Sequence, residues 1–161
     1  MRQTKGSYHY TESGLSNVVL TGVTIRVCSC GEKMPVIPSI EGLHRAIAMG
    51  IVKSKTPLTG EGIRFVRKEM QLKAVDLARL LSVNKVSISR WESGKEPIGH
   101  ANDKLMRLFF MREMEEECKQ MLRYEVRPLL ENISYKTYKA AQIKIPMDKL
   151  KTGALTGPPL C

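Results

Sequence analysis

Residues 72–94, LKAVDLARLLSVNKVSISRWESG, predict two short helices joined by a tight turn. In the first helix, over 72–81, apolar residues recur at helical spacing and the charged residues fall on the other side. Asn84 follows the turn and is a good N-cap, because its side chain can accept a backbone amide of the next helix. The expected inward residues of the first helix are Leu72, Val75, Leu77, Ala78, Leu80 and Leu81.

The second helix, which begins after Asn84, carries a cationic and hydrogen-bonding face. Ile88 and Trp91 lie one turn apart and, with Val83, are expected to point inward. Gly94 supplies a left-handed stop at the end of the helix. The residues left on the outside are Lys85, Val86, Ser87, Arg90 and Lys95.

This spacing resembles the helix-turn-helix of the Cro and lambda-repressor type, also called the xenobiotic-response-element (XRE) type. Members of that type place the second helix of the motif in the major groove and contact base edges from its first turn and a half. The alternative is a plain helical hairpin, but a generic hairpin has no reason to match the whole set in register. The matching residues are Leu77, Ala78, Val83, Ile88, Ser89, Trp91, Glu92 and Gly94.

The resemblance implies which residues contact DNA. Lys85, Val86 and Arg90 correspond to base-facing positions, and the planar fork of Arg90 suits guanine O6 and N7, worth about 1 to 3 kcal/mol of discrimination. The family usually opens the first helix with a capping residue and a glutamine. This chain has Lys73 and Ala74 there, and Lys73 can replace the phosphate contact. In the turn, Ser82 stands where the family has a glycine, so the resemblance implies a left-handed Ser82 at a cost of about 1 kcal/mol. The full expected set is Lys73, Asn84, Lys85, Val86, Ser87, Ser89, Arg90 and Lys95, with Ser87 and Ser89 nearer the phosphates.

The resemblance also implies an inward salt bridge between Arg67, on the preceding helix, and Glu92. Both residues are then structural although they are charged. Changes to either are expected to alter stability and not the recognised sequence.

The composition is basic. The 161 residues carry a formal charge of +10 and the pI is about 9.6, with nine basic and five acidic residues within 55–100. Such a surface favours polyanions, and it also suits a membrane surface or an acidic protein. The sequence contains no apolar run near the roughly 20 residues of a membrane span and no signal-peptide core at its start, so a soluble cytoplasmic protein without membrane partners is expected. Its four cysteines do not form a dense disulfide framework, which agrees with a reducing compartment.

The sequence before the motif favours strands. Residues 1–7 are predicted to be a loose tail, 18–27 a strand region with a turn or bend at Gly22, and Val36–Ile37 a further strand of a small antiparallel sheet. Ser39 is predicted to cap a helix whose periodic residues are Ile40, Leu43, Ile47 and Ile51. After a linker over 52–58, Thr59 is predicted to cap a helix with Ile63, Val66 and Met70 inside.

A further helix is predicted from Ala101 to Pro128, with Leu105, Leu108 and Phe109 in the core. A second apolar stripe on this helix consists of Met111, Met114, Cys118 and Met121. It is expected to pack either against the N-terminal module or, as the favoured alternative, against a second copy of the chain in a dimer seam. The segment 141–147 alternates Ile143 and Ile145 with polar residues, as an edge strand or an extended arm would, and 151–161 has a composition typical of disorder.

The expected fold class is α+β. A small N-terminal antiparallel β module with one helix occupies 1–54, and an all-α helix-turn-helix domain of the lambda-repressor-like type occupies 55–110. A helix extension, the candidate dimer seam, follows at 111–130. A C-terminal arm and tail complete the chain at 131–161.

The N-terminal module together with the motif resembles the MqsA or YgiT-type antitoxin family, through YHYTESGLSNV, CSCGE, IPSIEGLHRAI and LTGEGIRFVRKEM. In that family a zinc-bearing N-terminal part binds a toxin and the C-terminal part binds the operator. Two Cys-x-x-Cys pairs hold the zinc there, whereas this chain has only Cys28 and Cys30. His9 and His44 could supply the two missing zinc ligands, but their spacing does not require them to lie near the cysteines. A degenerate zinc module without bound metal is therefore expected. His100 is expected beside a phosphate or in solvent.

Two functions follow from these observations. The first is a dimeric, sequence-specific transcriptional repressor that binds a double-stranded DNA operator. The alternative is an antitoxin whose N-terminal module neutralises a cognate toxin and whose helix-turn-helix regulates their shared promoter. An enzyme is not expected, because no His or carboxylate is spaced to orient a cysteine nucleophile.

Overall fold

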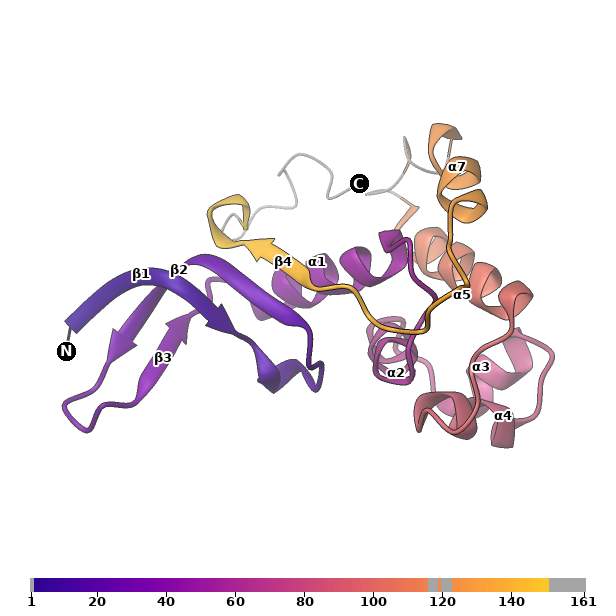
Figure 1. Ribbon diagram of the computed structural model, residues 1–161, viewed down its shortest axis with the longest axis horizontal. Coiled ribbons are helices and arrows are strands. Elements are labelled where there is room, and N and C mark those ends of the chain that lie inside the picture. Colours follow the sequence, from indigo (N-terminus) through magenta and orange to yellow (C-terminus); the bar gives the residue numbers. More distant parts are fainter. Residues whose placement is uncertain (1, 116–118, 120–122, 151–161) are drawn as a thin grey trace.

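The computed structural model describes residues 2–115, 119 and 123–150, and it places a four-stranded sheet at one end of the molecule and the helices at the other (Figure 1). This arrangement confirms the α+β class. In chain order the elements are β1 (Arg2–His9), η1 (Thr11–Ser13), β2 (Val18–Val27), β3 (Lys33–Val36), α1 (Ile40–Lys53), α2 (Gly60–Glu69), α3 (Ala74–Leu80), α4 (Lys85–Glu92), α5 (His100–Glu113), α7 (Val126–Glu131), β4 (Ile143–Pro146) and η2 (Met147–Lys149).

The long strand β2 is the centre of the sheet. One edge of β2 pairs with β1, antiparallel, along almost its whole length. On the other edge, residues 18–21 pair with β4 and residues 24–27 pair with β3. The strands of the N-terminal module thus pair antiparallel as expected, whereas the β4 pairing is parallel and makes the whole sheet mixed. The prediction of a loose tail over 1–7 was wrong for residues 2–7, because they belong to β1, while Met1 lies outside the described residues.

Gly22 is a bulge inside β2 and not a turn. The register changes from Gly6 opposite Val23 to Tyr8 opposite Leu20, so β2 contains one extra residue there, and Gly22 has a φ of 67°. Buried side chains fall at Val18 and Leu20 before the bulge and at odd-numbered positions after it. Neighbouring side chains of a strand point to opposite faces, so the even-numbered and the odd-numbered buried residues would otherwise lie on opposite faces. The one inserted residue puts both sets on the same face of the sheet.

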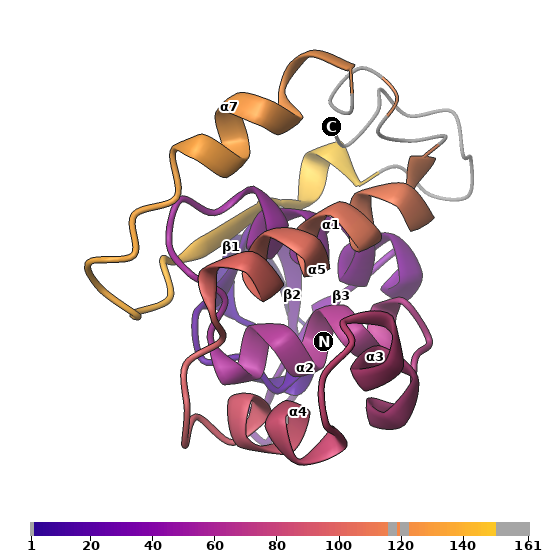
Figure 2. The same cartoon turned by 90° about the vertical axis from the view of Figure 1, so that its right-hand side faces the viewer.

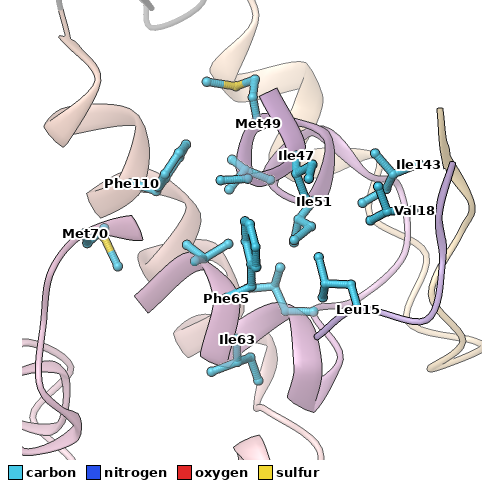
Figure 3. Close-up of a cluster of buried hydrophobic side chains, with 14 of the residues drawn as sticks. Leu15, Val18, Ile47, Met49, Ile51, Ile63, Phe65, Met70, Phe110 and Ile143 are labelled. Atoms are coloured by element: carbon cyan, nitrogen blue, oxygen red, sulfur yellow. The ribbon is translucent and has the colours of Figure 1, made fainter. Parts of the chain in front are cut away.

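Helix α1 joins the sheet to the other helices through one continuous core. Figure 3 shows Ile51 of α1 between Ile143 of β4 and Phe65 of α2. Gly50 permits the close approach to β4, because a Cβ there would lie 2.8 Å from Cγ2 of Ile143. The Ser39 cap is confirmed, since its side chain accepts the amide of Gly42 at 3.0 Å. The Thr59 cap of α2 is confirmed as well.

The inward face of α5 differs from the predicted one. Leu105 is 39% exposed, whereas Met106, Phe110 and Met111 are fully buried. Met111 therefore belongs to the core and not to a separate stripe, and Met114 packs against the same core. The other two stripe residues, Cys118 and Met121, lie outside the described residues, as does the segment 151–161. The buried face of α5 is displaced from the predicted one because two charged residues, Asp103 and Arg107, are part of it.

Asp103 and Arg107 form an ion pair with no solvent exposure on either side chain. The carboxylate of Asp103 also accepts the amide of Leu58 at 2.8 Å. The pair thereby fixes the linker between α1 and α2 against α5. The guanidinium of Arg107 donates to three backbone carbonyls, those of Val52 (2.7 Å), Ser54 (2.6 Å) and Thr56 (2.7 Å).

Pro128 does not end the long helix. Helix α5 ends at Glu113, and Pro128 lies in the first turn of the separate helix α7, a position that tolerates a residue without an amide hydrogen. None of the helices among the described residues has the length and apolar composition required to cross a membrane.

We expect Asp103→Ala to lower the free energy of unfolding by about 3–5 kcal/mol, because it leaves the Arg107 charge buried without its carboxylate. Urea denaturation followed by circular dichroism measures this change. The control is Glu131→Ala, which breaks the exposed pair between Arg127 and Glu131 and should cost at most about 1 kcal/mol. Equal losses in the two variants would show that the buried pair does not hold the linker.

Candidate nucleic-acid interface

Helices α3 and α4 lie at the end of the molecule farthest from the sheet (Figures 1 and 2). Lys73 precedes α3 and its side chain makes no capping hydrogen bond, as expected. The carboxylate of Asp76 instead accepts the backbone amide of Lys73 at 3.3 Å, which supplies half of a capping box. Leu77, Ala78 and Leu81 face the core as predicted. Val75 and Leu80 are exposed, so their predicted inward position was wrong.

The turn between α3 and α4 has the predicted left-handed residue. Ser82 has a φ of 54°, and the amide of Val83 donates to the carbonyl of Ala78 at 2.9 Å, which closes the C-terminus of α3. Asn84 then caps α4, because its side chain accepts the amide of Val86 at 2.9 Å. A second left-handed residue, Gln71 with a φ of 56°, lies before α3 and was not foreseen.

Helix α4 is held by an apolar face and exposes a polar one. Ile88 is fully buried and Trp91 is buried, while Val83 is half-buried beside them. Val86, at 54% exposure, is an apolar side chain left in solvent within a cationic surface. The other predicted contact residues divide into the exposed Lys73, Asn84, Lys85, Ser89, Arg90 and Lys95 and the half-buried Ser87.

The N-terminus of α2 abuts the C-terminal end of α4. Gly60 permits this contact, because a Cβ at that position would lie 2.6 Å from the carbonyl oxygen of Trp91 and 2.7 Å from that of Glu92. The positive end of one helix dipole thus meets the negative end of the other, which is favourable. The contact fixes where α4 ends relative to α2.

The ion pair between Arg67 and Glu92 is present. Nε of Arg67 donates to Oε1 of Glu92 at 2.5 Å, and Nη2 donates to Oε2 at 3.1 Å, with side-chain exposures of 13% and 8%. Arg67 also donates to the carbonyl of Leu72 at 2.8 Å, and Arg64 approaches the same carboxylate at 3.4 Å. Glu92 therefore ties α4 to α2 and to the start of α3.

The outer end of α4 contains a contact that the sequence reasoning missed. Nη1 of Arg90 donates to Oε1 of Glu96 at 2.8 Å, and both side chains are about half exposed. By contrast, within the part of the chain that the structure describes, no carboxylate pairs with Lys73, Lys85 or Lys95. A charged hydrogen-bonding surface is therefore available along α4 with one acidic side chain at its end.

The residues considered for zinc are not brought together. His9 bonds to the carbonyl of Ser16 at 2.9 Å, and His44 lies 3.4 Å from Glu69. Among the described residues, no three His, Cys, Asp or Glu side chains are grouped so that they could hold a metal ion. Cys28 and Cys30 are free thiols in the turn between β2 and β3. Hydrogen bonds from the backbone and the thiol of Cys30 lower the pKa of Cys28 to about 7.

His100 is exposed to solvent and packs against the C-terminal arm. Its ring stacks on Tyr135 with centroids 3.7 Å apart, and Nε2 lies 3.4 Å from the hydroxyl of Tyr138. Burial, together with the charge of Asp103, raises the pKa of Tyr135 to about 12. This contact holds the arm that leads to β4.

Comparison of the chain with protein-family models, with curated proteins and with solved structures found no match. The likeness to the Cro and lambda-repressor type therefore stays a prediction from residues 72–94. The likeness to the antitoxin family stays a prediction as well.

We expect Glu92→Gln to lower the free energy of unfolding by about 1.5–3 kcal/mol, the worth of hydrogen bonds to a charged group. The reason is that the guanidinium of Arg67 loses its carboxylate in a largely buried place. Thermal and urea denaturation measure the effect, and Glu131→Gln, in an exposed pair, is the matched control. A melting curve like that of the unchanged protein would contradict a structural role for this pair.

Proposed function

We propose that this protein is a sequence-specific DNA-binding regulator of transcription, a repressor, that places α4 in the major groove of a double-stranded operator. The observation that carries the proposal is the division of α4 into two faces. Ile88 and Trp91 anchor one face in the core, whereas Lys85, Val86 and Arg90 are exposed on the other. Helix α4 lies at an outer end of the molecule (Figures 1 and 2), and the side chains of this face are exposed, so a duplex can reach them.

The exposed side chains have the chemistry of base readout. An arginine fork bonds guanine O6 and N7 together, and an apolar side chain such as Val86 suits the thymine methyl group. Lys85 can bond guanine or neutralise a phosphate. The residues assigned to the backbone or to the edge of the contact are Lys73, Asn84, Ser87, Ser89 and Lys95.

The charge of the chain supports a polyanionic partner. A formal charge of +10 attracts DNA and makes binding sensitive to salt, since each phosphate contact releases counterions. This part of the affinity is independent of sequence. Discrimination between sites has to come from the few side chains of α4 that reach base edges.

The proposed repressor acts in the cytoplasm. It acts there as a homodimer, because helix-turn-helix dimers read two half-sites about one helical turn apart. Met111 cannot belong to the dimer seam, since it is fully buried within one copy. A selected binding site shows the symmetry directly. Two inverted half-sites are expected from selection on random duplexes, and one isolated half-site would count against a dimer.

A second candidate function is that of an antitoxin. The observation that favours it is the position of β1, whose outer edge pairs with none of the described residues and lies at the end of the molecule opposite α4 (Figure 1). An unpaired edge can accept an extended segment of a partner protein. The test is whether the full chain binds and silences a protein encoded next to it. The full chain is required because β4, from residues 143–146, completes the sheet.

We expect Arg90→Ala to reduce affinity for the selected operator by about 5- to 150-fold, the range of a lost arginine–guanine pair. Affinity for unrelated DNA of equal length should change far less. Fluorescence anisotropy at fixed salt measures both. Arg127→Ala removes an equal charge from the remote helix α7 and is the control. An equal loss on both DNAs would refute a base-reading role for Arg90.

A further inference from the structure

The chain that leaves α4 turns back onto the end of that helix. Gly94 has a φ of 72°, and the amides of Lys95 and Glu96 donate to the carbonyl of Arg90 at 2.9 and 3.3 Å. The backbone, and not the side-chain contact alone, therefore sets the place of Glu96 relative to α4. As a result, the carboxylate of Glu96 lies beside the guanidinium of Arg90.

The contact uses only one part of the guanidinium. Nη1 of Arg90 donates to Oε1 of Glu96 at 2.8 Å. Nε and Nη2 lie together on another edge of the planar group, and among the described residues they have no acceptor. Two parallel N–H groups on one edge are what a bidentate contact with guanine O6 and N7 requires.

We propose that Glu96 is a positioning residue that determines specificity: it holds Arg90 so that the Nε–Nη2 edge is presented to guanine. The proposal rests on the proposed function of α4 in DNA binding. A free arginine side chain has many rotamers, and ordering it before binding reduces the entropy lost on binding. The operator thus gains affinity from an arginine that is already in place.

Glu96 also weakens contacts with the wrong DNA. Its negative charge offsets that of Arg90, so this arginine contributes little to general attraction for phosphates. The arginine then contributes chiefly where a guanine meets its free edge. Removing the carboxylate is therefore expected to change the two kinds of binding in opposite directions.

The test uses the full chain and measures affinity for the selected operator and for unrelated DNA of the same length. For Glu96→Gln we expect operator affinity to fall and unrelated affinity to rise, so that their ratio falls about tenfold, a part of the discrimination of an arginine–guanine pair. The matched control is Glu131→Gln, which removes the same charge from the exposed pair with Arg127 at 2.8 Å. The ratio should not change in the control. Melting temperatures should be alike, because exposed pairs contribute little to stability.

A double-mutant cycle separates positioning from simple charge. In the Arg90→Ala background, Glu96→Gln should leave the affinity ratio unchanged, since no guanidinium remains to be held. The same tenfold fall in that background would overturn the proposal. Equal tightening of Glu96→Gln on both DNAs would also overturn it, because Glu96 would then be only a repulsive charge.

Failure of the proposed function is visible before any variant is made. A wild-type protein that selects no sequence from random duplexes does not discriminate among DNAs, and both proposals then fall. A wild-type protein that selects an operator, combined with an unchanged ratio in Glu96→Gln, overturns the role of Glu96 alone.

Discussion

The buried ion pair of Asp103 and Arg107 is the constraint on which the arrangement of the molecule depends. A charge without solvent is stable only when its partners are complete, and here the guanidinium bonds to Asp103 and to three carbonyls at the end of α1 and in the linker. Because those carbonyls belong to 52–56 and the pair itself belongs to α5, the linker cannot move away from α5 without leaving charge unpaired. The sheet and the helices therefore share one core.

The position of α4 is set by contacts on its inner side. These are the burial of Ile88 and Trp91, the close approach at Gly60, and the bonds of Glu92 to α2. Lys85, Val86 and Arg90 take no part in these inner contacts. The outward face is therefore separate from the contacts that hold the helix, as the proposed reading surface requires.

Local features of this fold could be predicted from sequence, and contacts between distant segments could not. The caps at Ser39, Thr59 and Asn84 depend on a few adjacent residues, so their signals lie in the sequence itself. The left-handed Ser82 was implied by the resemblance, because a glycine occupies that turn in the family. The parallel pairing of β2 with β4 joins residues more than 120 positions apart, and no local pattern encodes it. Burial of Asp103 and Arg107 was missed because charged residues are ordinarily assigned to the surface. That error displaced the predicted core face of α5.

The two carboxylates near the end of α4 differ in burial, and their proposed roles, structural for Glu92 and positioning for Glu96, differ in the same way. Glu92 is 8% exposed, and its charge is met by Arg67 and Arg64. Glu96, about half exposed, makes one bond to Arg90, and among the described residues the Nε–Nη2 edge of that arginine has no acceptor. Resemblance to a known motif could suggest the first pair because it recurs in the motif's core. The second depends on where the chain turns after Gly94, and no local pattern in the sequence specifies that turn.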